Sequence, residues 1–198
     1  MGAYSPSKLI NKELDQKIIK KIIEPTLKGI QDLKTNFKGF LYAGLMIKDN
    51  EPYLIEYNVR MGDPECQTIL PRLENDLMDV IEAVINCKLD SIDLTWQNSK
   101  SLCVVLCSKG YPERFQNEVE IVNLEKLEIE KNDNEFIFHA GTKIIDKKIF
   151  SNGGRVLNFV KQSKNFKKSR DDIIILLDKL NWKNGFFRRD IGHKVIEI

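Results

Sequence analysis

The sequence lacks the features that mark membrane, secreted and nucleic-acid-binding proteins. It contains no apolar run long enough to cross a bilayer. Residues 1–16 become charged where a signal peptide would have its apolar core. Lys and Arg number 31 against 29 acidic residues, and the resulting net charge of +2 predicts no polyanionic partner. We therefore expect a cytoplasmic protein that binds neither nucleic acid nor a membrane.

Cysteine is scarce and its spacing excludes the common cysteine sites. The four residues Cys66, Cys87, Cys103 and Cys107 form no C-x-x-C pair, so a zinc site is not expected. If 102–107 is a strand, Cys103 and Cys107 lie roughly 13 Å apart on one face, which is too far for a disulfide. We expect buried free thiols in a reducing compartment.

Helical periodicity is strongest near the beginning of the chain. Apolar residues recur at helical spacing over residues 11–33, with lysines and glutamates on the other face. Asn11 is placed to cap this helix, and Pro25 is expected to kink or split it. A second helix is expected over 75–86 and a final one over 169–180.

Strand patterns occur in two regions. A mostly apolar run at 40–47 and a return strand at 53–60, with turn residues at 49–52 between them, predict an antiparallel hairpin. A polar stretch at 89–100 indicates a domain boundary. Short strands follow it, and we expect them over residues 102–108, 118–122, 136–140, 143–146, 148–151 and 155–160. The chain should be α+β, in two parts that meet near Leu94.

The strand expected at 53–60 carries the most informative residues. Because side chains alternate along a strand, Glu56, Asn58 and Arg60 should share one side. The opposite side, expected to face the core, carries Ile55, Tyr57 and Val59. A carboxylate and an amide oxygen two residues apart suit Mg²⁺, and a neighbouring arginine suits a phosphate or carboxylate. The alternative is a solvated polar strand face.

An acidic loop follows this strand. Gly62 permits close backbone approach, Pro64 stiffens the chain, and Asp63 and Glu65 add two carboxylates. Such a loop can hold a small amine, although Gly-Asp-Pro is also ordinary turn chemistry. Residues 152–155, Asn-Gly-Gly-Arg, are open in the same way: they form a turn, or they line the rim of an active site.

These motifs together resemble one family. Residues 60–67 read RMGDPECQ and are followed by LPRL at 70–73, which closely resembles the signature of the glycinamide ribonucleotide synthetases. Further matches follow in order along almost the whole chain: MGAYSP at 1–6, IEPT at 23–26, YAGLM at 42–46, GYP at 110–112, FHAGT at 138–142, NGGRVL at 152–157 and FRRDIG at 187–192. One tetrapeptide would be weak evidence, but this many motifs in sequence order is strong evidence.

The resemblance implies a fold and a reaction. Residues 1–94 would be the second half of an ATP-grasp domain, with antiparallel strands and flanking helices, and 95–198 the family's small strand-rich C-terminal domain. The family is a carbon–nitrogen ligase of purine biosynthesis. It uses ATP as co-substrate to join glycine to 5-phosphoribosylamine through a glycyl phosphate, giving glycinamide ribonucleotide, ADP and phosphate.

The resemblance also assigns roles to residues. Glu56 and Asn58 match the metal ligands, for Mg²⁺ or Mn²⁺, which would bridge the ATP phosphates. Arg60 would steady the transferring phosphoryl group or the acyl phosphate, and Asp63 would hold glycine or its ammonium. The residues implied to bind substrate are Gly62, Asp63, Pro64 and Glu65, the last more as a support for the loop.

The chain departs from the family in three places. Met61 stands where the signature has Phe or Leu, a tolerable apolar exchange. Other ATP-grasp enzymes carry a further acidic metal ligand that falls, by spacing, near Gly44, which has no side chain. The family's N-terminal domain and ATP-clamping subdomain should precede Met1, so we expect a truncated chain that is inactive alone and has the missing half as a partner.

Two other functions remain open at this stage. The chain could be a non-catalytic fragment, or the partner-binding half of a split ligase. It could also belong to a different ATP-grasp ligase, such as a biotin-carboxylase-like enzyme, but the GDPE loop and the RRDIG-like tail argue against that reading.

Overall fold

The computed structural model describes residues 1–127 and 134–196. The chain forms two compact units, and each of them is built from stretches that are not consecutive in the sequence. Unit 1 contains Met1–Pro6, Asp63–Arg72 and Gln97–Ile198, and unit 2 contains Ser7–Gly62 and Leu73–Trp96. The predicted boundary between residues 94 and 95 separates two family domains. These are not the same as units 1 and 2, so the boundary stays a prediction.

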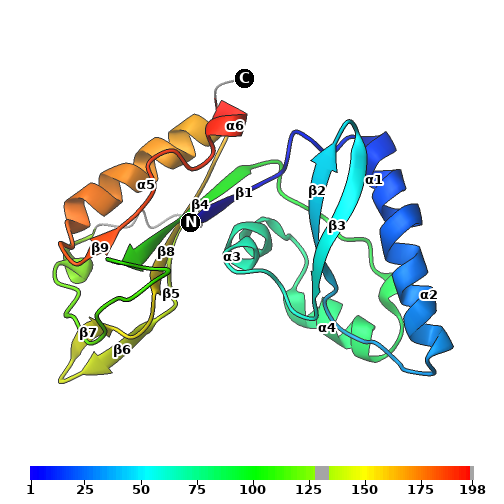
Figure 1. The fold of residues 1–198 in the computed structure, drawn as a ribbon, viewed down its shortest axis with the longest axis horizontal. Helices are drawn as coiled ribbons and strands as arrows, with labels where there is room; N and C mark the ends of the chain where they lie inside the picture. Colours follow the sequence, from blue (N-terminus) through cyan, green and yellow to red (C-terminus); the bar gives the residue numbers. More distant parts are fainter. Residues whose placement is uncertain (128–133, 197–198) are drawn as a thin grey trace. The chain divides into compact units, whose positions relative to one another are not determined.

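Unit 1 is built on an antiparallel sheet with the strand order β1-β4-β8-β5, and β9 pairs with the end of β4 (Figure 1). The strands are β1 (Gly2–Ser5), β4 (Lys100–Ser108), β5 (Glu135–His139), β8 (Arg155–Ser163) and β9 (Gly185–Phe186). A separate hairpin joins β6 (Thr142–Ile145) to β7 (Lys148–Ser151). The helices of this unit are α3 (Glu65–Ile69), α5 (Phe166–Leu180) and α6 (His193–Ile196), with 3₁₀ turns at Leu70–Arg72 and Leu124–Lys126.

The sheet of unit 1 is buried on both faces, which explains the unbroken apolar run at 102–107. Leu102, Val104 and Leu106 pack with residues of α5 on one face. The alternate residues of β4 pack with Val160, Phe136 and Phe138 on the other, and α3 contacts β1, β4 and β8. Cys103 and Cys107 are among these buried residues. All four cysteines are free as predicted, but Cys66 is only half-buried and Cys87 is exposed.

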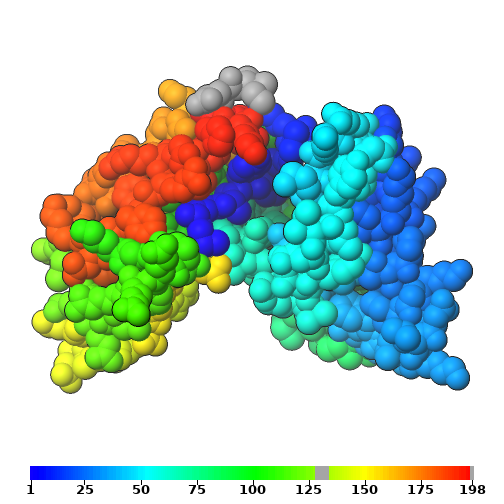
Figure 2. Space-filling model, viewed as in Figure 1, coloured from blue at the N-terminus to red at the C-terminus, as the bar shows by residue number. Residues whose placement is uncertain are grey.

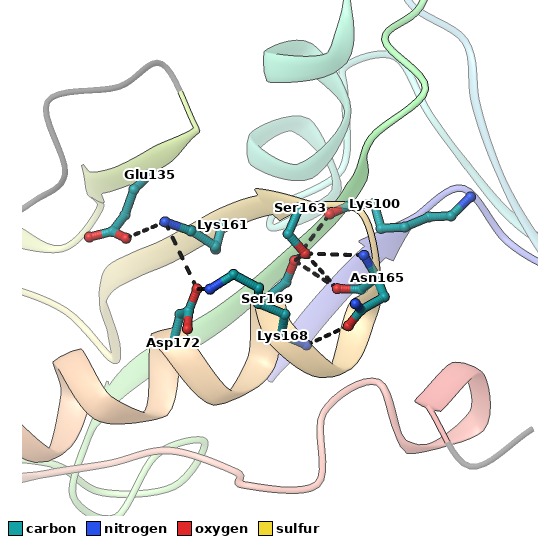
Figure 3. A network of polar contacts seen from close by, with 8 residues as sticks. All are labelled: Lys100, Glu135, Lys161, Ser163, Asn165, Lys168, Ser169 and Asp172. Atoms are coloured by element: carbon teal, nitrogen blue, oxygen red, sulfur yellow. Dashed lines mark hydrogen bonds and ion pairs between the residues drawn. The ribbon is translucent and has the colours of Figure 1, made fainter.

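Helix α5 is tied to the sheet by a polar network (Figure 3). The ammonium of Lys161, buried on β8, lies 2.8 Å from a carboxylate oxygen of Glu135 on β5 and 4.0 Å from Asp172 on α5. Asn165 caps the helix, because its side-chain oxygen accepts a hydrogen bond from the backbone N–H of Lys168 at 2.8 Å. This cap explains why α5 begins before the predicted residue 169.

Unit 2 packs one long helical segment against a hairpin. The segment comprises α1 (Lys12–Ile18), a π-helical stretch (Ile19–Ile23) and α2 (Glu24–Asp32). The predicted cap is confirmed, since Asn11 Oδ1 accepts from the Leu14 N–H at 2.8 Å. Pro25 does not split the segment: the wider π turn precedes it, and the Thr26 hydroxyl donates to the Ile22 carbonyl at 2.6 Å.

The hairpin itself consists of β2 (Tyr42–Lys48) and β3 (Glu51–Asn58). Its turn is tighter than predicted, because Asp49 and Asn50 both have positive φ and form a two-residue connection. Glu51, just after the turn, accepts from Lys17 and Lys21 of the helical segment at 2.8 and 2.5 Å. These hydrogen bonds, above all that from Lys17, lower the pKa of Glu51 to about 2. Helix α4 (Leu77–Ile85), capped by Asp76, and a 3₁₀ turn (Leu89–Ser91) complete the unit.

Several sequence-based expectations need correction. Residues 118–122 are not a strand: within them Glu120 makes an isolated antiparallel bridge to Phe150 of β7. Strands β1 and β9 and helices α3 and α6 were not predicted, so 169–180 does not hold the final helix. Among the described residues, no helix combines the length and apolar character needed to cross a membrane.

Candidate active site

The site residues predicted from the sequence are divided between the two units. Glu56, Asn58, Arg60 and Gly62 belong to unit 2, whereas the segment Asp63-Pro64-Glu65, which we term the DPE segment, belongs to unit 1.

Glu56 and Asn58 lie together at the end of β3. The Asn58 side-chain amide donates to Glu56 Oε1 at 3.1 Å, so the two side chains share one face of the hairpin. Both oxygen-bearing groups are accessible to solvent at least in part. A carboxylate with a neighbouring carboxamide oxygen is a donor set that fits Mg²⁺, which takes few protein ligands and fills its remaining positions with phosphate and water.

Gly44 lies directly opposite Glu56 in the hairpin. A Cβ at this position would approach Glu56 Cγ to 3.0 Å, closer than ordinary packing allows. The missing side chain therefore leaves room for the Glu56 carboxylate. This gives a physical reason why a glycine stands at the position where spacing places an acidic residue in other ATP-grasp enzymes.

The expected core face of β3 is wrong for two of its three residues. Ile55 is 66% exposed and Val59 is 75% exposed. The pairing shifts between Gly44 and Leu45, which leaves Ile55 without a partner, and the strand ends at Asn58, so strict alternation fails on both sides. Tyr57 does point to the helical segment, where its hydroxyl contacts the Thr26 hydroxyl and lies 3.3 Å from the Ile22 carbonyl. In Figure 2 the hairpin, in cyan, lies at the surface of unit 2.

Arg60 follows the end of β3 and is not placed by strand alternation. Its Nη1 donates to the backbone carbonyl of Met61 at 2.8 Å, and the side chain is exposed. The structure thus brings Glu56 and Asn58 together but does not put Arg60 on the same strand. The role suggested for Arg60 stays a prediction.

The DPE segment leads into helix α3. Pro64 precedes the helix, and its carbonyl accepts from the buried hydroxyl of Thr68 at 2.9 Å. Asp63 receives two partners that sequence reasoning did not find. Arg155 at the start of β8 contacts it with both terminal nitrogens, and the Gln67 side-chain amide donates to Asp63 Oδ1 at 3.0 Å. Burial, and secondarily the Asp63 charge, raise the pKa of the neighbouring Cys66 thiol, which makes it a poor nucleophile.

No larger acidic or histidine cluster competes with these residues as a metal site. Over residues 1–127 and 134–196, no three His, Cys, Asp or Glu side chains gather closely enough to hold an ion. Glu56 and Asn58 would thus contribute two protein ligands, one carboxylate oxygen and one carboxamide oxygen.

Known proteins match the chain over its whole length. Residues 1–66 match the family model described as "Phosphoribosylglycinamide synthetase, ATP-grasp (A) domain", and residues 101–194 match its "C domain". A phosphoribosylamine–glycine ligase of Fusobacterium nucleatum is 39% identical over 198 residues, which are 100% of this chain and 46% of that protein. The chain thus spans about half the length of the curated relatives it matches.

Solved structures agree with the sequence matches. The crystal structure of phosphoribosylamine–glycine ligase from Thermotoga maritima superposes with a TM-score of 0.80 at 29% identity, covering 97% of this chain and 46% of that one. Biotin carboxylase from Campylobacter jejuni, in complex with an ATP analogue, gives a TM-score of 0.53 at 12% identity, over 100% of this chain and 42% of that one, which shows the fold alone.

The chain is thus an α+β protein that carries part of an ATP-grasp domain followed by a strand-rich C-terminal region. Within the ATP-grasp proteins it belongs to the phosphoribosylglycinamide synthetase family.

Proposed function

We propose that this chain supplies the C-terminal part of a phosphoribosylamine–glycine ligase. The observation that carries the proposal is the meeting of Glu56 and Asn58 beside Gly44, on a hairpin of the family's ATP-grasp domain. The names of the relatives support the joining of glycine to 5-phosphoribosylamine, and the matching ATP-grasp domain supports ATP as the co-substrate.

The reaction would run in two steps. A glycine carboxylate oxygen attacks the γ-phosphorus of ATP, the bond to ADP breaks, and glycyl phosphate forms. The amine nitrogen of phosphoribosylamine then attacks the carbonyl carbon, phosphate leaves, and the amine loses a proton to solvent. Both steps depend on positioning and on stabilising the charge of the phosphoryl group.

The residues of this chain would divide that work. Glu56 and Asn58 would hold a divalent ion, Mg²⁺ or Mn²⁺, which when bound spreads the charge of the ATP phosphates. Arg60, exposed beyond β3, would steady the transferring phosphoryl group. Asp63 would bind the amine of glycine, and Gly62, Pro64 and Glu65 would shape its loop. A cytoplasmic location fits this chemistry and stays a prediction.

The proposal is tested by changing Glu56 to Gln in an enzyme completed with the upstream half of the Fusobacterium nucleatum relative. One negative charge is lost from the proposed metal site while the shape is kept. Mutation of a residue that only holds a metal ligand in place lowers metal affinity or activity by about 10- to 100-fold. Loss of a direct ligand should therefore lower the rate of Mg²⁺-dependent phosphate release by at least as much. The Mg²⁺ concentration for half-maximal rate should also rise.

Glu82→Gln is the matched control, since Glu82 is exposed on α4 in the same unit. It should leave rate and Mg²⁺ dependence unchanged. If Glu56→Gln behaves like Glu82→Gln, the metal role of Glu56 is wrong. If phosphate release from the unsubstituted enzyme does not depend on glycine, the proposed reaction is wrong.

A further inference from the structure

Residues 152–154 form a bend that leads into Arg155, the first residue of β8. The Gly153 and Gly154 carbonyls both accept from Ser108, from its hydroxyl and its N–H respectively, at 2.8 Å each. A Cβ on Gly154 would come within 2.1 Å of the Tyr111 ring. The glycine at 154 is therefore required by packing, and the bend gives the next residue, Arg155, a firm base.

Arg155 reaches the DPE segment by two separate contacts. Nη1 donates to the Asp63 backbone carbonyl at 2.8 Å, and Nη2 lies 3.2 Å from Asp63 Oδ2. Both side chains are about one-third exposed, 33% for Arg155 and 35% for Asp63, so the charge attraction alone is modest. Two contacts from one planar guanidinium nevertheless fix direction as well as distance.

The other oxygen of Asp63 is held from inside α3. Gln67 Nε2 donates to Asp63 Oδ1 at 3.0 Å, and Gln67 is one helical turn further along the chain. Asp63 therefore presents a carboxylate whose two oxygens each have a protein donor, with acceptor capacity left over, on a side chain that is 35% exposed. An amine that binds there would meet a carboxylate already oriented.

We propose that Arg155 is a positioning residue for the amino-acid substrate: it orients Asp63, which in turn receives the glycine amine. This inference rests on the proposed function for the role of Asp63. It assigns a purpose to the NGGR motif, whose glycines pack against Ser108 and Tyr111 while its arginine acts on a segment 92 residues earlier.

The test compares Arg155→Met, Arg155→Lys and Arg188→Met in the completed enzyme. Arg155→Met removes both contacts, so the KM for glycine should rise between about 10- and 100-fold, while the KM for ATP stays unchanged. Arg155→Lys keeps one donor and the charge and should restore part of the glycine affinity. Arg188 pairs with Asp190 on the surface of the same unit, and Arg188→Met should change neither KM. An unchanged KM for glycine, or a parallel rise in both constants, overturns the proposal.

An NMR measurement on the 198-residue chain separates this proposal from the proposed function. In Arg155→Met the side-chain NH₂ signals of Gln67 should shift, because their acceptor Asp63 is no longer held, and in Arg188→Met they should stay in place. Unmoved Gln67 signals in Arg155→Met overturn the positioning role even where the completed enzyme shows no glycine-dependent turnover. That lack of turnover in the unsubstituted enzyme counts against the proposed function alone.

Discussion

A single absent side chain, at Gly44, controls the space around Glu56. A Cβ there would lie 3.0 Å from Glu56 Cγ, whereas its contact with the Glu56 backbone oxygen, at 3.6 Å, would be ordinary. Gly44 does not have positive φ, so alanine is compatible with the backbone. The cost of the change should therefore fall on the carboxylate and not on the fold.

We predict that Gly44→Ala raises the Mg²⁺ concentration needed for half-maximal activity of the completed enzyme by about 10-fold or more, since a displaced metal ligand acts like a disturbed outer partner. The free energy of unfolding should change by less than about 1 kcal/mol. Gly29→Ala is the control, because a Cβ at Gly29 meets nothing within 4 Å, and it should leave the Mg²⁺ dependence unaltered. An unaltered Mg²⁺ dependence in Gly44→Ala would show that Glu56 has room to spare.

At the scale of elements, one buried ammonium joins β5, β8 and α5. Lys161 and Glu135 have side chains only 4% and 5% exposed. Removing one member leaves the other charge buried without its partner, which is costlier than the pair itself is stabilising.

We predict that Lys161→Met lowers the free energy of unfolding by about 3–5 kcal/mol. The double variant Lys161→Met/Glu135→Leu should recover most of this loss, because no unpaired charge stays buried. Urea unfolding followed by tryptophan fluorescence, to which Trp182, buried in the same unit, contributes, measures both. Lys168→Met, which removes an exposed pair with Asp172, should cost less than about 1 kcal/mol. The prediction would be contradicted if Lys161→Met lowered the free energy of unfolding no more than Lys168→Met does.

The elements that local patterns could predict are those that local residues stabilise. The helix at 12–32, its Asn11 cap and the β2–β3 hairpin follow from periodicity and turn chemistry close in sequence. Strand β1 does not, because Gly2–Ser5 is a strand only through pairing with Ser101–Val104, about half the chain away. Helix α3 is five residues long and begins directly after Pro64, where the sequence indicates a turn.

The candidate site divides in the same way. Glu56 and Asn58 were predictable because two residues on one strand share a face. Only one of the two partners of Asp63 could have been predicted from the sequence. Gln67 is four residues further along the chain, whereas Arg155 is 92 residues away and contacts Asp63 only because of the fold. The bulge at Ile55 broke the alternation on which the expected core face of β3 depended.

At the scale of the whole molecule, the chain matches only 46% of the first relatives' length. Phosphoryl transfer needs ATP and acceptor held together, and a misplacement of about 1 Å can cost about 100-fold. The 198 residues taken alone span less than half of the relatives' length, so we expect them not to meet that demand.

We predict that the 198 residues alone release no phosphate from ATP in response to glycine and phosphoribosylamine. Addition of the part of the relatives' sequence that the chain does not match, fused or in trans, should restore turnover. Robust turnover by the short chain would mean that the site is self-contained, and failure of every completed form would favour a non-catalytic, partner-binding role.

The exchange of segments between the units has a consequence for how this protein can be divided. Unit 1 is built from three separate stretches of the chain, which supply β1, α3 and the rest of the sheet. Unit 2 is built from two separate stretches. A single cut at any point from residue 7 to residue 96 leaves β1 on one piece and β4, its pairing partner, on the other. Neither unit can be cut out as one continuous segment, and a single crossover in the gene cannot transfer a whole unit between homologues. The two units of this protein are therefore inherited together.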